Sequence, residues 1–390
     1  MKIAIFHTEF AYSGGAERII FEEYKYFKSK GFNPEIFTAS TNYKSCYPAE
    51  IRNYKIDNLT PRFLSKIFPH EFLILVSFLF LPFWIKKLSS FDFYLAENQA
   101  GPWWAFVVSK ITGKPFGVYQ NYPTTIVYPR KIDLGVKRNI WYVDLIINLI
   151  KPFMIRMDKK IIKSANLRFS NGEYVTKVCG RAYGVKFINC PGGTVLGKFN
   201  KAIFDARFKD PYLLIMNRHF PAKEFEWGIK ALSILEEKHK LRNLKLIIAG
   251  SFTKYTDELI KLSEFLGINK KVKFVGLAQG KKWTNLYLNA LVFLYTAPEE
   301  DFGLGVIEAM AHGVPVIAWD NAGPKYVVKS GRTGYLAKLG GLGDFTDKIY
   351  KLISNKKLNQ KMSENAYLEA KNYSWQKHGE IVLNEIKKFS

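Results

Sequence analysis

Short apolar runs alternate with helical patterns along most of this 390-residue sequence. That alternation predicts parallel sheets covered by helices, the α/β fold class. The length suggests two domains, and the turn-forming cluster Pro191-Gly192-Gly193 is a natural boundary between them. We expect two Rossmann-like, doubly wound domains, residues 1–190 and 191–374, that face each other across a cleft. The last segment, 375–390, is expected to be mainly helical.

The expected strands of the first domain lie near 2–10, 34–39, 93–96, 116–120, 167–170 and 186–189. Those of the second lie near 212–216, 244–249, 271–275, 291–295 and 315–318. Helices are expected near 16–29, 71–88, 103–111, 139–164, 224–239, 257–266, 281–289, 305–312 and 344–353.

Cysteine content indicates the compartment. Cys46, Cys179 and Cys190 are too few and too scattered for a disulfide framework or a zinc site, which favours a reducing cytoplasm. The first residues form a short apolar strand and show no secretory signal pattern. We therefore expect a cytoplasmic protein.

The net charge of +24 would attract either nucleic acid or an anionic membrane. Basic residues are spread along the whole chain without an RNA-recognition or zinc-finger signature, so no nucleic-acid partner is expected. The longest apolar run, 72–85, would form a helix of about 21 Å, too short for a hydrocarbon layer of about 30 Å. It ends in Trp84-Ile85-Lys86-Lys87, so either a core helix or a helix docked on a membrane surface is possible.

The segment from Glu300 to Glu308 follows the predicted strand 291–295 and opens a helix. Its two carboxylates lie eight residues apart, and Gly303 and Gly305 between them permit a close backbone approach. Backbone N–H groups at a helix start can face a diphosphate. One carboxylate could bind sugar hydroxyls and the other a ribose, which favours a sugar nucleotide as ligand.

Two cations, Arg218 and Lys223, follow the predicted strand 212–216. Fixed cations at this position would stabilise the charge that grows on a departing diphosphate. A solvated basic loop is the simpler interpretation of this segment alone, but the acidic pair downstream argues against it. The sequence contains no D-x-D triplet, so we expect a metal-independent site.

These segments resemble glycosyltransferase family 4, a retaining family with the GT-B fold. Residues 300–308 resemble its E-x7-E signature, and 217–224 resemble its G-R-x5-K-G phosphate site, with Asn217 and Glu224 in place of the glycines. Residues 14–18 resemble its G-G-A-E-R segment. The resemblance implies catalytic roles for Arg218, Lys223 and Glu300. It also implies donor-binding roles for Gly14, Gly15, Gly250, Phe302, Gly303, Leu304 and Glu308, and a last helix that returns to the first domain.

A further segment, 119–123, resembles the Y-x-H-[FY]-P loop of mannosyltransferases that extend dolichol-linked oligosaccharides. Asn121 stands at the histidine position; asparagine cannot transfer a proton at neutral pH but can bind a sugar hydroxyl. Asn121 and His7 are placed on the acceptor side of the cleft. A lone histidine after an apolar strand is also typical of a near-core group, so His7 is given no catalytic role.

The resemblance implies a retaining transferase that moves a hexose, taken as mannose, from a UDP- or GDP-sugar to a lipid-linked acceptor, on the cytoplasmic face of a membrane. Transfer of glucose or N-acetylglucosamine from UDP to a soluble or cell-surface polysaccharide stays open. A dinucleotide oxidoreductase is disfavoured because no G-x-G-x-x-G follows the first strand. A non-catalytic basic binding module would not require the charged residues at positions 218, 223, 300 and 308.

Overall fold

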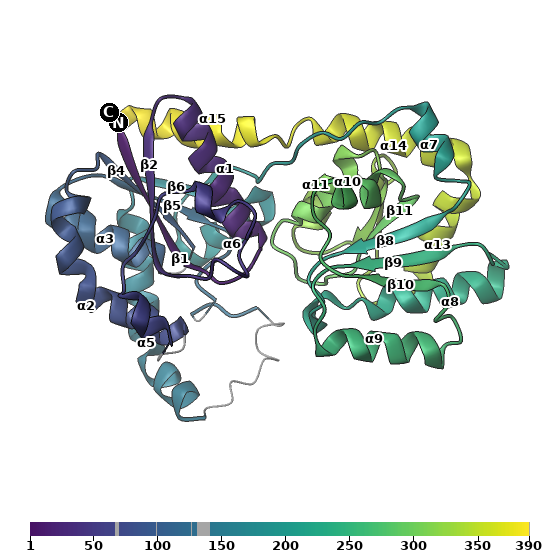
Figure 1. The fold of residues 1–390 in the computed structure, drawn as a ribbon, viewed down its shortest axis with the longest axis horizontal. Coiled ribbons are helices and arrows are strands. Elements are labelled where there is room, and N and C mark those ends of the chain that lie inside the picture. Colours follow the sequence, from purple (N-terminus) through teal and green to yellow (C-terminus); the bar gives the residue numbers. More distant parts are fainter. Residues whose placement is uncertain (67–69, 99, 126, 131–140, 390) are drawn as a thin grey trace. The chain divides into compact units, whose positions relative to one another are not determined.

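The computed structural model describes residues 1–66, 70–98, 100–125, 127–130 and 141–389 (Figure 1). The chain divides into two compact units. The first unit comprises Met1–Gly192 together with Trp375–Ser390, and the second unit comprises Gly193–Ser374. Each unit is built around one sheet.

The sheet of the first unit has seven strands in the order β3-β2-β1-β4-β5-β6-β7, all paired in parallel. The order reverses direction at β1, which lies between β2 and β4. The strands of this sheet are β1 (Lys2–Phe10), β2 (Asn33–Thr41), β3 (Ile56–Asn58), β4 (Phe93–Glu97), β5 (Phe116–Gln120), β6 (Leu167–Ser170) and β7 (Ile188–Asn189).

Helices cover both faces of this sheet because successive strand residues point to opposite sides. Ala4 and Phe6 of β1 pack beneath one helical layer, and Ile3 and Ile5 pack beneath the other. The first layer consists of α2 (His70–Leu88), α3 (Gly101–Thr112), α5 (Trp141–Ser164) and α6 (Gly172–Tyr183). The second consists of α1 (Gly15–Ser29) and α15 (Trp375–Ile386).

A buried polar cluster fastens α15 to the rest of the first unit. His378, 1% exposed, lies with Nε2 3.0 Å from Glu23 Oε1 and with Nδ1 3.0 Å from the carbonyl oxygen of Pro191. Burial alone lowers the pKa of His378, but its contacts with Cys190 and Glu23 outweigh burial and raise that pKa well above its usual value. A protonated imidazole satisfies both contacts, since it donates from both nitrogens.

Close backbone packing accompanies this cluster. A Cβ atom on Gly379 would lie 2.4 Å from the ring of Tyr26 on α1, so only glycine lets the two helices approach this closely. Helix α15 thus docks on α1 within the first unit.

The sheet of the second unit has six parallel strands in the order β10-β9-β8-β11-β12-β13. The order reverses direction at β8. The strands are β8 (Tyr212–Met216), β9 (Lys245–Ala249), β10 (Val272–Val275), β11 (Val292–Tyr295), β12 (Val316–Trp319) and β13 (Gly334–Ala337).

Helices again lie on both faces of this sheet (Figure 1). One face is covered by α8 (Glu226–His239), α9 (Lys254–Phe265) and α13 (Leu342–Ser354). The other is covered by α10 (Gly280–Leu288), α11 (Leu304–Ala311), α12 (Pro324–Val327) and α14 (Lys356–Ala370). A short helix, α7 (Lys201–Ala206), precedes β8.

The two ends of the second unit lie side by side. Thr194 pairs with Ser374 in an isolated β-bridge, and the Thr194 N–H donates to the carbonyl of Tyr373 at 2.9 Å. The chain therefore enters and leaves this unit at one place.

The predicted α/β class with two parallel, doubly wound sheets is confirmed. The predicted strands differ from the observed ones by at most two residues at either end. The expectations omitted the three-residue edge strand β3, because it is too short to show an alternating pattern. They also omitted α6, α7, β13 and α14.

Candidate functional site

The site residues predicted in the second half follow β8, β9 and β11, three neighbouring strands. In an open α/β sheet, ligands bind outside the carboxyl ends of the strands, next to the reversal of strand order. Because β8 is that reversal point, the loops after Met216, Ala249 and Tyr295 meet at one place. The topology alone therefore gathers residues that are about eighty positions apart in sequence.

Lys223 and Glu300 are in direct contact at this place. Lys223 Nζ lies 2.6 Å from Glu300 Oε2, and the two side chains are 21% and 20% exposed. The Thr296 hydroxyl donates to the carbonyl of Lys223 at 2.7 Å, which ties the two loops together below the ion pair. A cation and a carboxylate that remain partly open to solvent can each exchange this contact for a ligand.

Arg218 lies at the same end of β8 and is exposed. Its guanidinium stacks over the ring of Phe220 at 5.2 Å. Its backbone N–H donates to the Asn217 side chain at 2.9 Å, so the asparagine that replaces the usual glycine shapes this loop.

The second departure from the glycine pattern has a conformational explanation. Glu224 adopts a left-handed backbone, with φ 47° and ψ 51°, where glycine is normally favoured. Trp227 Nε1 donates to its carboxylate at 2.7 Å. The loop thus keeps a glycine-like turn although the residue is glutamate.

His219 lies between the two cations in sequence, but it is fully buried. Its Nδ1 is 2.9 Å from the Thr256 hydroxyl, and burial lowers its pKa to about 4. A neutral buried imidazole holds the start of α9 against the loop.

Gly250 follows β9, and its backbone lies close to the backbone of Asn217, which follows β8. A Cβ atom at position 250 would lie 1.8 Å from the carbonyl oxygen of Asn217, so only glycine allows the two loops to approach this closely. Phe252, two residues later, is 58% exposed beside them.

The turn from Glu300 to Gly303 leads into α11. Gly303 is the residue before this helix and has φ 88°, and no side chain caps the helix start. The turn rests on a second loop: the Gly323 N–H donates to the Glu300 carbonyl at 2.7 Å, and a Cβ on Gly323 would lie 2.3 Å from the Asp301 carbonyl oxygen. Phe302 is buried and Leu304 is half-buried.

Two tyrosines hold the paired carboxylates. The Tyr287 hydroxyl donates to Glu308 Oε2 at 3.0 Å, and the Tyr295 hydroxyl hydrogen bonds to Glu300. Burial, reinforced in each case by the neighbouring carboxylate, raises the pKa of both tyrosines well above the usual value. They therefore stay protonated and act as donors.

Neither tyrosine was predicted from the sequence to belong to the site. Tyr295 ends the strand that leads into the acidic segment, which is a usable signal. Tyr287 lies on α10, and only the packing of α10 against α11 brings it to Glu308.

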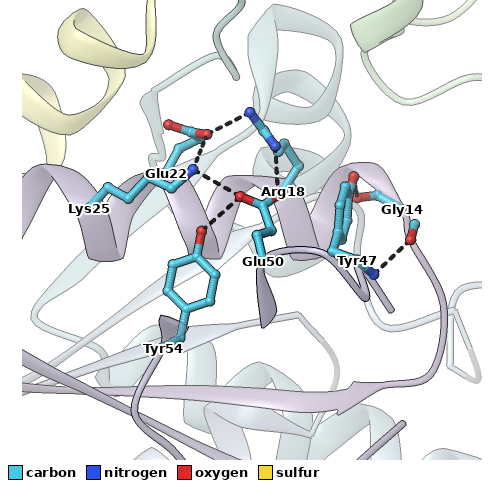
Figure 2. Close-up of polar contacts among 8 residues, drawn as sticks. Gly14, Arg18, Glu22, Lys25, Tyr47, Glu50 and Tyr54 are labelled. Carbon is cyan, nitrogen blue, oxygen red and sulfur yellow. Dashed lines mark hydrogen bonds and ion pairs between the residues drawn. The ribbon is translucent and has the colours of Figure 1, made fainter. Parts of the chain in front are cut away.

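In the first unit, the glycine turn 14–15 forms the start of α1: Gly14 is the residue before the helix, Gly15 is its first residue, and no side chain caps this end. Figure 2 shows the side chains around this turn; the Tyr47 hydroxyl donates to the Gly14 carbonyl at 2.9 Å. Arg18 forms ion pairs with Glu22 and Glu50, both at 2.8 Å. The glycine turn is thus placed by a network of side chains around α1.

Asn121 is part of a row of asparagines at the ends of adjacent strands. Its Nδ2 donates to Asn98 Oδ1 at 2.8 Å, and its Oδ1 accepts from Asn171 Nδ2 at 2.8 Å. The Gly192 N–H then donates to Asn171 Oδ1 at 2.9 Å. Asn121 therefore joins three loops, a function that the histidine of the mannosyltransferase loop would not serve in this way.

His7 is 3% exposed, packs on the ring of Phe10 at 4.7 Å, and lies with Nε2 3.7 Å from Glu17 Oε1. This burial fits the near-core interpretation of His7.

Within the ranges that the structure describes, no group of three or more His, Cys, Asp or Glu could hold a metal ion.

The second unit is similar in sequence to a known protein family. Residues 198–369 match the family model for glycosyl transferases group 1, which covers the site of the second unit. A D-inositol 3-phosphate glycosyltransferase of Nocardia farcinica is 29% identical over 178 residues, 45% of this chain and 40% of the relative. A probable sucrose-phosphate synthase of Thermosipho melanesiensis is 28% identical over 192 residues, 47% of this chain and 42% of the relative. The chain thus spans less than half the length of these curated relatives.

Solved structures match over the whole chain. Anabaena HepE in complex with UDP has a TM-score of 0.78 and 16% identity, with 100% of both chains covered. Sucrose-phosphate synthase from Thermosynechococcus elongatus has a TM-score of 0.77 and 16% identity, covering 100% of this chain and 98% of that one. The protein has the GT-B fold, and its residues 198–369 are similar to glycosyl transferases group 1.

Proposed function

We propose that this protein is a glycosyltransferase that binds a nucleotide-sugar donor at the carboxyl ends of β8, β9 and β11. The contact between Lys223 and Glu300 at the reversal point of the sheet carries this proposal, because it sets a cation beside a carboxylate that can bind sugar hydroxyls. The match of residues 198–369 to glycosyl transferases group 1 supports it.

Each charged residue has a separate role in this proposal. Lys223 and Arg218 stabilise the charge on the departing diphosphate, and the uncapped start of α11 supplies backbone N–H donors. Glu300 exchanges its contact with Lys223 for hydroxyls of the donor sugar. Glu308, oriented by Tyr287, binds the ribose. In this scheme the side-chain cations take the place of a metal ion.

The finer proposal is a retaining transferase of family 4 that uses GDP-mannose. It rests on the acidic signature at 300–308 and the loop at 119–123. UDP-glucose is the competing donor, because one solved Anabaena HepE structure contains UDP-glucose. A lipid-linked acceptor and attachment to the cytoplasmic face of a membrane are proposed from the charge of +24 and the apolar run 72–85. No helix in the described ranges is long and apolar enough to cross a membrane.

The test is a panel of UDP- and GDP-sugars scored by release of the nucleoside diphosphate, with and without polyprenyl-linked acceptors. Lys223→Ala should lower turnover by about 10²–10³-fold. Lys245→Ala is the matched control, because Lys245 pairs with Asp210 on the surface of the same unit. Release in EDTA supports a metal-independent site, and a strict need for Mg²⁺ or Mn²⁺ contradicts it. Near-normal turnover of folded Lys223→Ala would refute the proposed site.

A further inference from the structure

Helices α2, α3 and α5 lie side by side on one face of the first sheet, as their mutual packing shows. The side of this layer turned away from the sheet is called the helical face here. Several large apolar side chains are exposed to solvent on this face. They are Leu79, Phe83, Ile111, Leu149, Ile150 and Phe153.

Helix α2 is apolar on both sides. Leu73, Leu81 and Leu88 are at most 2% exposed and belong to the core. Leu79 and Phe83 are 74% and 80% exposed on the other side. The run 72–85 is thus partly core and partly surface: Ile74, Phe78, Trp84 and Ile85 also pack against the core, whereas Leu79 and Phe83 do not.

Helix α5 adds exposed apolar groups of its own. Leu149 is 73% exposed and Phe153 is 64% exposed. A soluble protein normally shows such residues singly, whereas several on one face mark a site of interaction.

Among the side chains that the structure describes, the exposed charges on this face have one sign. Lys86, Lys110, Arg156 and Lys160 are exposed on these three helices. Among the side chains that the model describes in α2, α3 and α5, the one acidic group is Asp158, which is fully buried. It accepts hydrogen bonds from Trp103, Thr124 and Tyr183. The face therefore offers apolar groups within a positive field and no exposed carboxylate among those described side chains.

We propose that the helical face docks on the surface of an anionic lipid bilayer. Leu79, Phe83 and Phe153 enter the boundary between headgroups and acyl chains, while the lysines and arginines contact lipid phosphates. Charge complementarity selects this occupant, because a second copy of the same face would bring like charges together. The inference rests on the membrane association in the proposed function and identifies the surface responsible.

The test is co-sedimentation of the full chain with phosphatidylcholine vesicles that contain or lack phosphatidylglycerol. Leu79→Gln with Phe83→Gln should lower the vesicle-bound to free ratio about tenfold or more, since two large apolar groups no longer leave water. Leu81 is buried, so it is left unchanged. Phe265→Gln with Leu368→Gln is the matched control, because these residues are 86% and 55% exposed in the second unit.

A second pair of variants tests the charge. Arg156→Gln with Lys160→Gln should weaken binding to phosphatidylglycerol vesicles and leave binding to neutral vesicles unchanged. Lys238→Gln with Lys261→Gln is the control in the second unit. Circular dichroism of every variant checks that it is folded.

Three outcomes would overturn the proposal: equal wild-type binding to both vesicle types, full binding by the folded apolar variant, or equal loss in the control variants. Self-association that disappears in the apolar variant would assign the face to a second copy instead. Binding of UDP and GDP is titrated in parallel by intrinsic fluorescence. Nucleotide binding without vesicle binding refutes only this inference, and vesicle binding without nucleotide binding refutes only the donor site.

Discussion

Replacement of His378 by leucine should destabilise the first unit strongly. Glu23 on α1 and His378 on α15 are 0% and 1% exposed, and their 3.0 Å contact links the two helices. His378→Leu leaves the Glu23 carboxylate buried beside Glu97. Breaking a buried pair from one side costs about 3–5 kcal/mol. For a unit of this size, that loss lowers the melting temperature by about 6–20 °C.

The assay is differential scanning calorimetry, in which the transition of the first unit should move and that of the second should stay. The double variant Glu23→Leu/His378→Leu should be more stable than the single variant, because no unpaired carboxylate remains. Lys388→Gln breaks the exposed pair with Glu385 and should cost about 1 kcal/mol or less. A loss below about 1 kcal/mol in His378→Leu, or equal losses in the single and double variants, would refute this reasoning.

The remaining predictions concern pH and the donor site. Burial and the adjacent Glu23 raise the pKa of Glu97 well above its usual value, and the pKa of His378 is also raised, so the folded state holds more protons than the unfolded chain. The first unit should therefore lose stability as the pH rises above the ordinary pKa values of the two groups, about 4.3 for Glu97 and about 6.5 for His378. Melting temperatures measured across this pH range check the prediction, and a melting temperature that increases with pH would contradict it. Tyr287→Phe removes a hydrogen bond to the Glu308 carboxylate and should weaken nucleotide binding about 10–100-fold at near-normal stability, as measured by isothermal titration; unchanged affinity would argue against the ribose role. Gly250→Ala forces a Cβ toward the Asn217 carbonyl and should cost about 2 kcal/mol or more in urea unfolding. Gly276→Ala should cost less, because its Cβ would meet the Phe252 ring at 4.0 Å, an ordinary van der Waals contact.

The sequence was enough to predict the sheets because parallel buried strands leave continuous apolar runs, such as 212–216 and 291–295. It was also enough to place Lys223 and Glu300 in loops that follow strands, and the observed strand order makes these two strands neighbours. The direct contact between them depends on the loop conformations and could not be predicted from spacing.

Other features depend on pairings that sequence does not encode locally. Asn98, Asn121 and Asn171 each follow a strand, but their row requires the strand register. Glu23 and His378 are 355 positions apart, and only the return of α15 joins them. Glu224 differs from these examples. It replaces a glycine of the G-R-x5-K-G pattern in the sequence, yet its backbone adopts the left-handed conformation that glycine favours.

The return of α15 has a consequence for biosynthesis. The second unit, Gly193–Ser374, is inserted between the two pieces of the first. A ribosome therefore completes the whole of the inserted unit before it makes His378. Until then the nascent amino-terminal piece has an exposed apolar side on α1 and a Glu23 carboxylate without its imidazole. Domains usually finish folding in the order of their synthesis, and this connectivity reverses that order, so the inserted unit can mature first.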